Sequence, residues 1–123
     1  MARVIIDTSS ILYGISFRKD IFAIAAMRFP GSTMIISKGV LRELSGISKG
    51  NGRRGADAMA ALALIRVKNV KVDTDSGTAD SWALRSARHN NFIVITNDTA
   101  LLRRIKQINP NVFKLSKSGA IRR

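Results

Sequence analysis

Four of the eight acidic residues in this sequence stand where a carboxylate could do chemistry rather than simply face solvent. Asp7 and Asp98 each follow an apolar run that is typical of a buried strand. Glu43 lies within a predicted helix, and Asp80 opens another. Acids are scarce in this chain, since Lys and Arg together number 21. Scarce carboxylates at the ends of predicted strands favour a functional site over ordinary surface.

A cluster of these four carboxylates would need a counter-charge. Like charges a few ångströms apart repel by several kcal/mol at an effective dielectric constant of about 20, so the groups would take up protons or destabilise the fold. A divalent cation resolves this conflict, and oxygen ligands without any cysteine thiolate suit Mg²⁺ or Mn²⁺. A cation held in this way can activate water and stabilise the charge that builds up on a phosphodiester. The acids therefore indicate hydrolysis of a nucleic-acid backbone.

Each acid taken alone also has a purely structural interpretation. Asp80 would interact favourably with a helix dipole, and Asp7 or Asp98 could cap the helix that follows it. Glu43 could be a solvated helix residue. It is the joint placement that favours function. The other four acids fall in helix starts or loops and are interpreted as surface residues: Asp20, Asp57, Asp73 and Asp75.

Length and composition predict one folded domain that attracts polyanions. The chain has 123 residues, 46% of them apolar, and no cysteine, which excludes disulfides and cysteine-ligated zinc. Its net charge of +13 favours nucleic acid as a partner ahead of an anionic membrane. No apolar run approaches the roughly 20 residues that span a bilayer, and no targeting segment is evident. We therefore expect a cytoplasmic protein with no membrane contact.

Hydrophobic patterning predicts an α/β domain built on a parallel sheet. Three runs are continuously apolar or β-branched, as in central strands, and two alternate as edge strands do. The continuous runs are residues 4–6, 33–36 and 92–96, and the alternating runs are 70–72 and 112–115. Helical spacing separates them, at 22–29, 40–47, 58–67, 79–87 and 101–105. Such alternation indicates right-handed crossovers, which bring the carboxyl ends of the strands to one crevice.

Three further segments carry expectations of their own. Residues 58–67 are apolar nearly all round, which is typical of a core helix. The glycine-rich, basic segment 45–55 predicts a mobile loop between two helices. It is either a plain surface connection or an RNA-binding loop, whose phosphate contacts would come from Lys49, Arg53 and Arg54 together with Arg42. The polar, basic tail 116–123 is expected to fray unless a partner orders it.

The acids also carry a resemblance to a known family. The strings Val4–Ser9 (VIIDTS) and Ile95–Asp98 (ITND), together with Glu43 and Asp80, are similar to the motifs of the PIN-domain nucleases. They occur in the matching order, with 36, 37 and 18 residues between successive acids. The resemblance covers the chain from Val4 to about Leu115.

This resemblance implies a three-layer α/β/α fold with a five-stranded parallel sheet, in which a nuclease domain (1–115) precedes a basic tail (116–123). It implies a Mg²⁺- or Mn²⁺-dependent endoribonuclease whose catalytic and metal-binding acids are Asp7, Glu43, Asp80 and Asp98. Small hydroxyl positions near the metals are matched by Thr8, Ser9 and Thr96, and a polar neighbour is matched by Asn97.

Within the family, the run from Thr96 to Arg104 and the short basic tail resemble the rRNA-processing branch more than the VapC toxins. The chain lacks a further acid at residues 99–101, where many VapC toxins carry one, which leaves open whether one or two metal ions bind. The resemblance implies RNA as the partner. A second copy of the chain, or an antitoxin in the case of a toxin, would be its protein partners.

Other function classes fit the residues less well. A response-regulator receiver needs paired acids after its first strand, and an Asp-x-Asp phosphatase needs an acid where Ser9 stands. The stronger alternative is a non-catalytic module that binds RNA through its basic loop and tail. His89 follows Arg88 at a predicted helix end, where a cation is favourable, and it is interpreted as structural.

Overall fold

The computed structural model describes residues 2–123 and contains a six-stranded sheet. Its strands are β1 (Arg3–Ile6), β2 (Thr33–Ser37), β3 (Lys71–Asp73), β4 (Phe92–Ile95), β5 (Val112–Leu115) and β6 (Ile121–Arg122). They lie in the order β3-β2-β1-β4-β5-β6, and the first five are parallel. The predicted α/β fold with five parallel strands is confirmed, and β6 adds a short antiparallel strand beside β5.

The strand positions follow from the hydrophobic patterning. The continuously apolar runs form β1, β2 and β4, which occupy the middle of the sheet, and every side chain from Val4 to Ile6 is fully buried. The alternating segment at 70–72 forms the edge strand β3 as predicted. The second alternating segment, β5, is not an edge strand, because β6 pairs with its outer side. Its residues Val112, Phe113 and Leu115 are buried.

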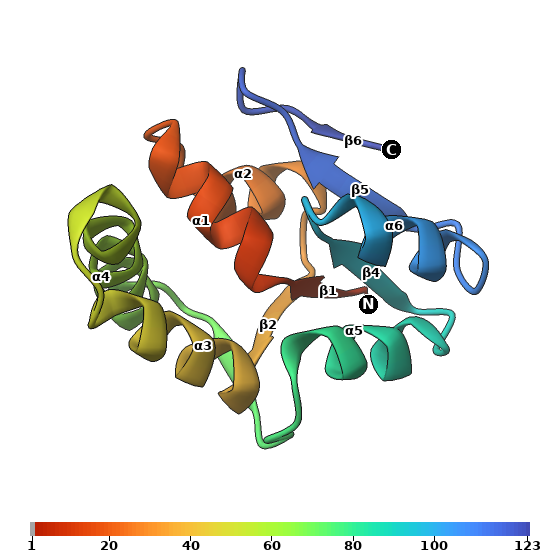
Figure 1. Ribbon diagram of the computed structural model, residues 1–123. Coiled ribbons are helices and arrows are strands. Elements are labelled where there is room, and N and C mark those ends of the chain that lie inside the picture. Colours follow the sequence, from red (N-terminus) through yellow and green to blue (C-terminus); the bar gives the residue numbers. More distant parts are fainter. Residues whose placement is uncertain (1) are drawn as a thin grey trace.

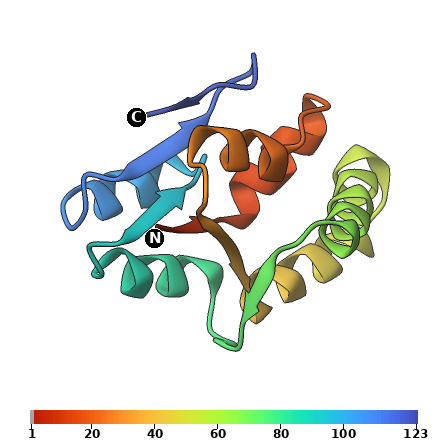
Figure 2. The same ribbon diagram turned by 180° about the vertical axis from the view of Figure 1, so that it is seen from behind.

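Helices connect the strands and flank the sheet. They are α1 (Thr8–Ser16), α2 (Ile21–Arg28), α3 (Lys38–Ser48), α4 (Gly52–Val67), α5 (Ala79–Ala87) and α6 (Thr99–Lys106). Figure 1 shows α5 and α6 beside β4 and β5, and the reverse view in Figure 2 shows α2 in front of the strands. In both views the α3–α4 hairpin stands to one side of the sheet, next to α1. Helices α1 and α3 begin directly after the carboxyl ends of β1 and β2.

The predicted mobile loop at 45–55 is wrong. Helix α3 continues to Ser48 and α4 begins at Gly52, so only residues 49–51 connect them. Gly55 is buried in the first turn of α4, and a Cβ atom there would lie 2.1 Å from the carbonyl oxygen of Gly50. Gly55 therefore serves close packing of α4 against the end of α3 rather than mobility, because only a residue without Cβ allows that approach.

Helix α4 is not the core helix that its composition predicted. Only Gly55, Ala58 and Ala61 are buried, whereas Met59 is 62% exposed and Val67 is 78% exposed. The helix packs on α3 and α1 along a narrow stripe of small residues. Within residues 2–123, neither α4 nor any other helix has the length and apolar character needed to cross a membrane.

The C-terminal tail is ordered, contrary to the expectation of fraying. Ile121 is buried and pairs with Leu115 in the β5–β6 ladder. The Ser116 amide also donates to the Ala120 carbonyl oxygen at 2.8 Å, which closes a turn at Gly119. One buried isoleucine and a short hairpin thus anchor a segment whose composition is otherwise polar and basic.

Candidate active site

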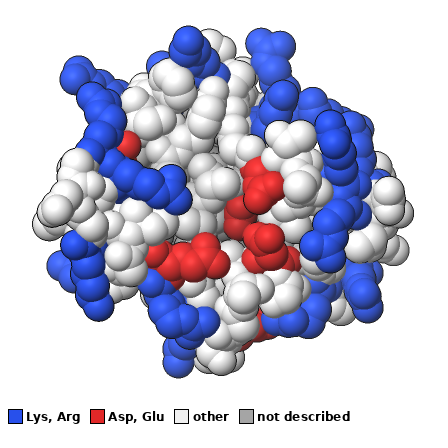
Figure 3. All heavy atoms as spheres, viewed as in Figure 1, with Lys and Arg blue, Asp and Glu red and all other residues white. Residues whose placement is uncertain are grey.

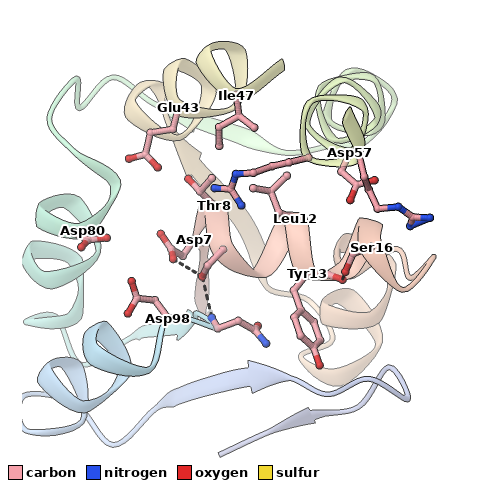
Figure 4. A pocket seen from close by; sticks show the side chains of 14 residues that line it. Asp7, Thr8, Leu12, Tyr13, Ser16, Glu43, Ile47, Asp57, Asp80 and Asp98 are labelled. Carbon is pink, nitrogen blue, oxygen red and sulfur yellow. Dashed lines mark hydrogen bonds between the residues drawn. The ribbon is translucent and has the colours of Figure 1, made fainter. Parts of the chain in front are cut away.

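All four predicted acids line one cavity of about 650 Å³ at the carboxyl ends of β1 and β4. Asp7 follows β1, Glu43 comes from α3, Asp80 from α5, and Asp98 follows β4. Figure 4 shows their carboxylates grouped on one side of the cavity. Separate elements of the parallel sheet thus deliver the acids to a common crevice, as expected for this sheet type.

Asp7 is the most buried of the four, with 3% of its surface exposed. Its Oδ2 atom accepts hydrogen bonds from Ser9 Oγ at 2.6 Å and from Thr96 Oγ1 at 3.0 Å. Burial raises the pKa of Asp7 above its usual 3.8, and the negative charge of Glu43 adds to the rise, while the two hydroxyl donors oppose it. The two hydroxyls therefore hold a carboxylate whose charge the site does not otherwise neutralise.

The residues after β4 form the hydrogen-bonded support of this carboxylate. Thr96 is fully buried, and its hydroxyl also accepts from the Asp98 amide at 3.2 Å. Asn97 Oδ1 accepts from Ser10 Oγ at 2.7 Å and from the Leu115 amide at 3.1 Å, which ties α1 to β5. The predicted supporting residues Ser9, Thr96 and Asn97 thus all lie in one network around Asp7.

Thr8, the remaining supporting residue, presents an unsatisfied polar group. It lines the cavity with 6% of its surface exposed. Among the described side chains, its Oγ1 is the one buried polar atom that has no hydrogen-bond partner. A buried hydroxyl without a partner costs free energy, so this atom favours a bound ligand or ordered water in the cavity.

The other three acids differ in what holds them. Asp98 caps α6 by accepting from the Leu101 amide at 3.1 Å, and Glu43 accepts from the Ala79 amide at 3.2 Å, at the start of α5. Asp80 has no hydrogen bond or ion pair with any described residue. Its pKa is raised by partial burial and then by the charges of Asp7, Asp98 and Glu43, with Arg104 opposing. The four acids are therefore close enough to repel one another.

The donor set suits a hard divalent cation that keeps part of its water shell. All four side chains offer carboxylate oxygens, which Mg²⁺ and Mn²⁺ prefer, and a cation between them would neutralise their mutual repulsion. Within residues 2–123, however, no three carboxylate or imidazole side chains are arranged to hold one ion together. The arrangement fits a cation bound by one or two carboxylates and several waters.

The four predicted RNA-binding residues divide into two pairs. Arg53 and Arg54, in the first turn of α4, line the cavity. Arg42 donates to the Ser76 carbonyl oxygen, and neither it nor Lys49 lines the cavity. In Figure 3, Lys and Arg side chains surround a compact acidic area on this face of the molecule. A polyanion approaching the acids would therefore meet positive charge on the way.

The cavity also has residues that the sequence interpretation missed. Asp57 was interpreted as a surface residue, but it lines the cavity from α4, one helical turn after Arg53 and Arg54. Its spacing of three and four residues from Arg54 and Arg53 puts the three side chains on one helix face, but that spacing does not show that this face meets the acids. Helices α1 and α3 contribute the other missed residues, namely Leu12, Tyr13, Ser16 and Ile47.

Known proteins with the same architecture were found by sequence and by structure. Residues 4–118 match the family model described as a PIN like domain. None of the curated protein sequences is significantly similar to the chain.

Three solved structures share the fold. The PIN domain endonuclease Utp24 superposes with a TM-score of 0.76 at 24% identity, covering 97% of this chain and 90% of that chain. A domain of a functionally unknown protein from Methanocaldococcus jannaschii has a TM-score of 0.65 at 23% identity, with 94% and 92% covered. VapBC-1 from nontypeable Haemophilus influenzae has a TM-score of 0.62 at 18% identity, with 94% and 98% covered. Because the family model matches residues 4–118, nearly the whole chain, the chain belongs to the PIN-like domain family, whose fold is that of the PIN nucleases.

Proposed function

We propose that this protein is a metal-dependent endoribonuclease that hydrolyses phosphodiester bonds of RNA. The observation that carries the proposal is the convergence of Asp7, Glu43, Asp80 and Asp98 on one cavity of an otherwise basic molecule. Membership of the PIN-like domain family supports it, since PIN domains are typically nucleases. A basic surface alone would suit RNA binding without chemistry, but such binding gives no reason to gather four carboxylates.

The acids would share the work of binding the cation. Asp7 and Asp98, which follow adjacent strands, would supply direct ligands, and Asp80 with Glu43 would hold a second ion or the waters of the first. Ser9 and Thr96 keep the Asp7 carboxylate in one orientation through Oδ2. Mg²⁺ or Mn²⁺, when bound, would supply an activated water and neutralise charge on the phosphate, leaving a 5′ phosphate on the product. Arg53 and Arg54 would hold the RNA backbone from the opposite wall.

Ribosomal RNA processing is the biological role that we propose. The sequence from Thr96 to Arg104 supports it, and the similarity to the PIN domain endonuclease Utp24 is compatible with it. The alternative role is that of a VapC-type toxin restrained by an antitoxin. The fold shared with VapBC-1 is compatible with this role as well. The chemistry of the two roles is the same, and they differ in target and partner.

Changing Asp7 to Asn tests the chemistry. Asn keeps the size of the side chain and can accept the Ser9 and Thr96 hydrogen bonds, but it lacks the charge that binds the cation. We expect cleavage of single-stranded RNA in Mg²⁺ or Mn²⁺ to fall more than about a hundredfold, since metal affinity depends on the carboxylate. Affinity for RNA, measured by fluorescence anisotropy, should change by only a few fold.

A matched control replaces an acid outside the cavity. In Asp20→Asn the amide oxygen can still cap α2, and only a surface ion pair with Lys68 is lost. This variant should cleave RNA at the parental rate. An Asp7→Asn protein that cuts as fast as the parent would refute the assignment of Asp7. If the parent protein binds RNA but does not cleave it in Mg²⁺ or Mn²⁺, the non-catalytic RNA-binding module is favoured.

A further inference from the structure

The cavity extends beyond the four acids to a second end with different chemistry. Figure 4 shows Leu12, Tyr13, Ser16 and Asp57 on the side away from the carboxylate group of Asp7, Asp80 and Asp98. Leu12, Tyr13 and Ser16 come from α1, and Asp57 comes from α4. Its total volume of about 650 Å³ lies in the range typical of ligand sites and leaves room for more than the scissile phosphate.

The Asp57 carboxylate contacts no donor group among the described residues. Among the acids that the structure describes, only Asp57 and Asp80 make no hydrogen bond or ion pair, and the environment of Asp80 is explained by the acid cluster. Asp57 is half-buried at the opposite end of the cavity, on the helix face that carries Arg53 and Arg54. An ionised carboxylate only accepts hydrogen bonds, so its natural ligand is a group with adjacent donors.

The surfaces around Asp57 suit a flat, partly apolar ligand. Leu12, Tyr13 and Ile47 are half-buried and line the cavity with apolar atoms. The Tyr13 ring is held by Phe17, with ring centroids 4.8 Å apart. Ser16 Oγ donates to the Tyr13 carbonyl oxygen at 2.7 Å, so its lone pairs remain free to accept. Unstacked bases of single-stranded RNA are recognised by this combination of apolar faces and polar edges.

Of the four RNA bases, guanine complements this end of the cavity best. Its Watson–Crick edge presents two adjacent donors, the N1–H and the 2-amino group, which can meet both oxygens of one carboxylate. Adenine and cytosine place a single amino donor beside a ring-nitrogen acceptor, and uracil places its N–H between two carbonyl oxygens. Those acceptors would repel the Asp57 charge.

We propose that this end of the cavity is a guanine-binding subsite that places a guanosine next to the cleaved bond, with Asp57 accepting hydrogen bonds from its N1–H and 2-amino group. The inference rests on the proposed ribonuclease function and gives it a sequence preference. The enzyme would then recognise the base of one nucleotide beside the scissile phosphate. Its contacts with the RNA backbone would not depend on the RNA sequence.

The test compares guanosine with inosine, which keeps the N1–H but lacks the 2-amino group. Uridine oligoribonucleotides with one central guanosine, inosine, adenosine or cytidine are cleaved in Mg²⁺ or Mn²⁺, and cut positions are mapped on sequencing gels. We expect the guanosine oligonucleotide to be cut beside its purine about tenfold faster than the inosine one, because one hydrogen bond to a charged group is lost. Adenosine and cytidine should be cut more slowly still.

Two variants test whether Asp57 causes the preference for guanosine over inosine. In Asp57→Asn the ratio of guanosine to inosine cleavage should fall to near one, whereas Asp20→Asn should keep the parental ratio. Melting curves of the variants check that both are folded. A parent that cuts all four oligonucleotides equally, or an Asp57→Asn variant that keeps the parental ratio, overturns the subsite and leaves the ribonuclease function standing.

The same oligonucleotides separate the subsite from the proposed function. If no cleavage occurs with either metal, the ribonuclease proposal fails, and the affinities of the guanosine and inosine oligonucleotides for the parent are then compared by anisotropy in EDTA. A preference for guanosine of about tenfold that Asp57→Asn removes would uphold the subsite, and equal affinities would refute it.

Discussion

The buried carboxylate of Asp7, which we propose as a metal ligand, lowers the stability of the folded protein. Burial raises its pKa above 3.8, so the folded protein retains a proton that the unfolded chain has already released. The folded state therefore loses stability as the pH rises from about 3.8 through the higher pKa of the folded form, and it does not regain this stability at neutral pH. Asn carries no such charge.

We therefore expect Asp7→Asn to be more stable than the parent in EDTA near neutral pH. The gap should narrow on acidification to about pH 3, where the parental carboxyl is mostly protonated in both states. Thermal melts at the two pH values measure it. A parent at least as stable as the variant at neutral pH would show that the Ser9 and Thr96 hydrogen bonds offset the cost of burial.

Sequence reasoning located the acidic residues of the site but not its full extent. Asp7 and Asp98 were predictable because a residue just after a central parallel strand lies at the crevice whatever the details of packing. Asp57 was not, since its place depends on how α4 docks against α1 and α3, which depends on tertiary contacts. The unpaired Thr8 hydroxyl likewise emerges only from the finished packing.

At the scale of elements, the turn between α3 and α4 decides where Arg53, Arg54 and Asp57 lie. The approach of Gly55 to the Gly50 carbonyl oxygen is too close for any side chain. We expect Gly55→Ala to destabilise the fold by about 2 kcal/mol, in the range of overpacked sites. Urea denaturation followed by circular dichroism measures the free energy of unfolding.

Gly46 provides the matched control for this substitution. It lies inside α3, and a Cβ atom there would meet nothing within 4 Å. Gly46→Ala should stabilise the fold by roughly 0.5–1 kcal/mol, because alanine favours the helix. Equal effects of the two alanines would mean that the α3–α4 turn relaxes around an added methyl group and does not fix the cavity wall.

The hydrophobic pattern predicted some elements correctly and failed for the segment 45–55 and for β6, and both failures have the same physical cause. Strands β1, β2 and β4 are predictable because burial on both faces demands continuous apolar residues. The segment 45–55 has the composition of a loop, yet its Gly55 allows α4 to pack closely on the end of α3. Strand β6 depends on the single buried Ile121 and on the free edge of β5. In both cases a neighbouring element, not local composition, decides the conformation.

At the scale of the whole molecule, the charge arrangement predicts how RNA binding responds to salt. The net charge is +13, and Lys and Arg side chains surround the acidic area. The basic surface attracts RNA over a long range, whereas the acidic cavity repels its phosphates at short range. A smaller hollow of about 180 Å³ adjoins the cavity at Asn97 and is lined by Lys106, Lys114 and Arg123, among others. These cations, from α6, β5 and the ordered tail, would continue an RNA backbone path that begins at Arg53 and Arg54.

Replacing both Lys106 and Lys114 with Gln should flatten the salt dependence of RNA binding. Each lost phosphate contact removes about 0.7 from the slope of log affinity against log salt for a single strand, so the slope should fall by roughly 1.4. Anisotropy titrations at several salt concentrations measure it. The control Lys68→Gln with Lys71→Gln removes the same charge near β3, at the opposite edge of the sheet, and should keep the parental slope. Equal slopes for the two double variants would mean that net charge alone attracts RNA, and that its path over the surface does not include the hollow beside Asn97.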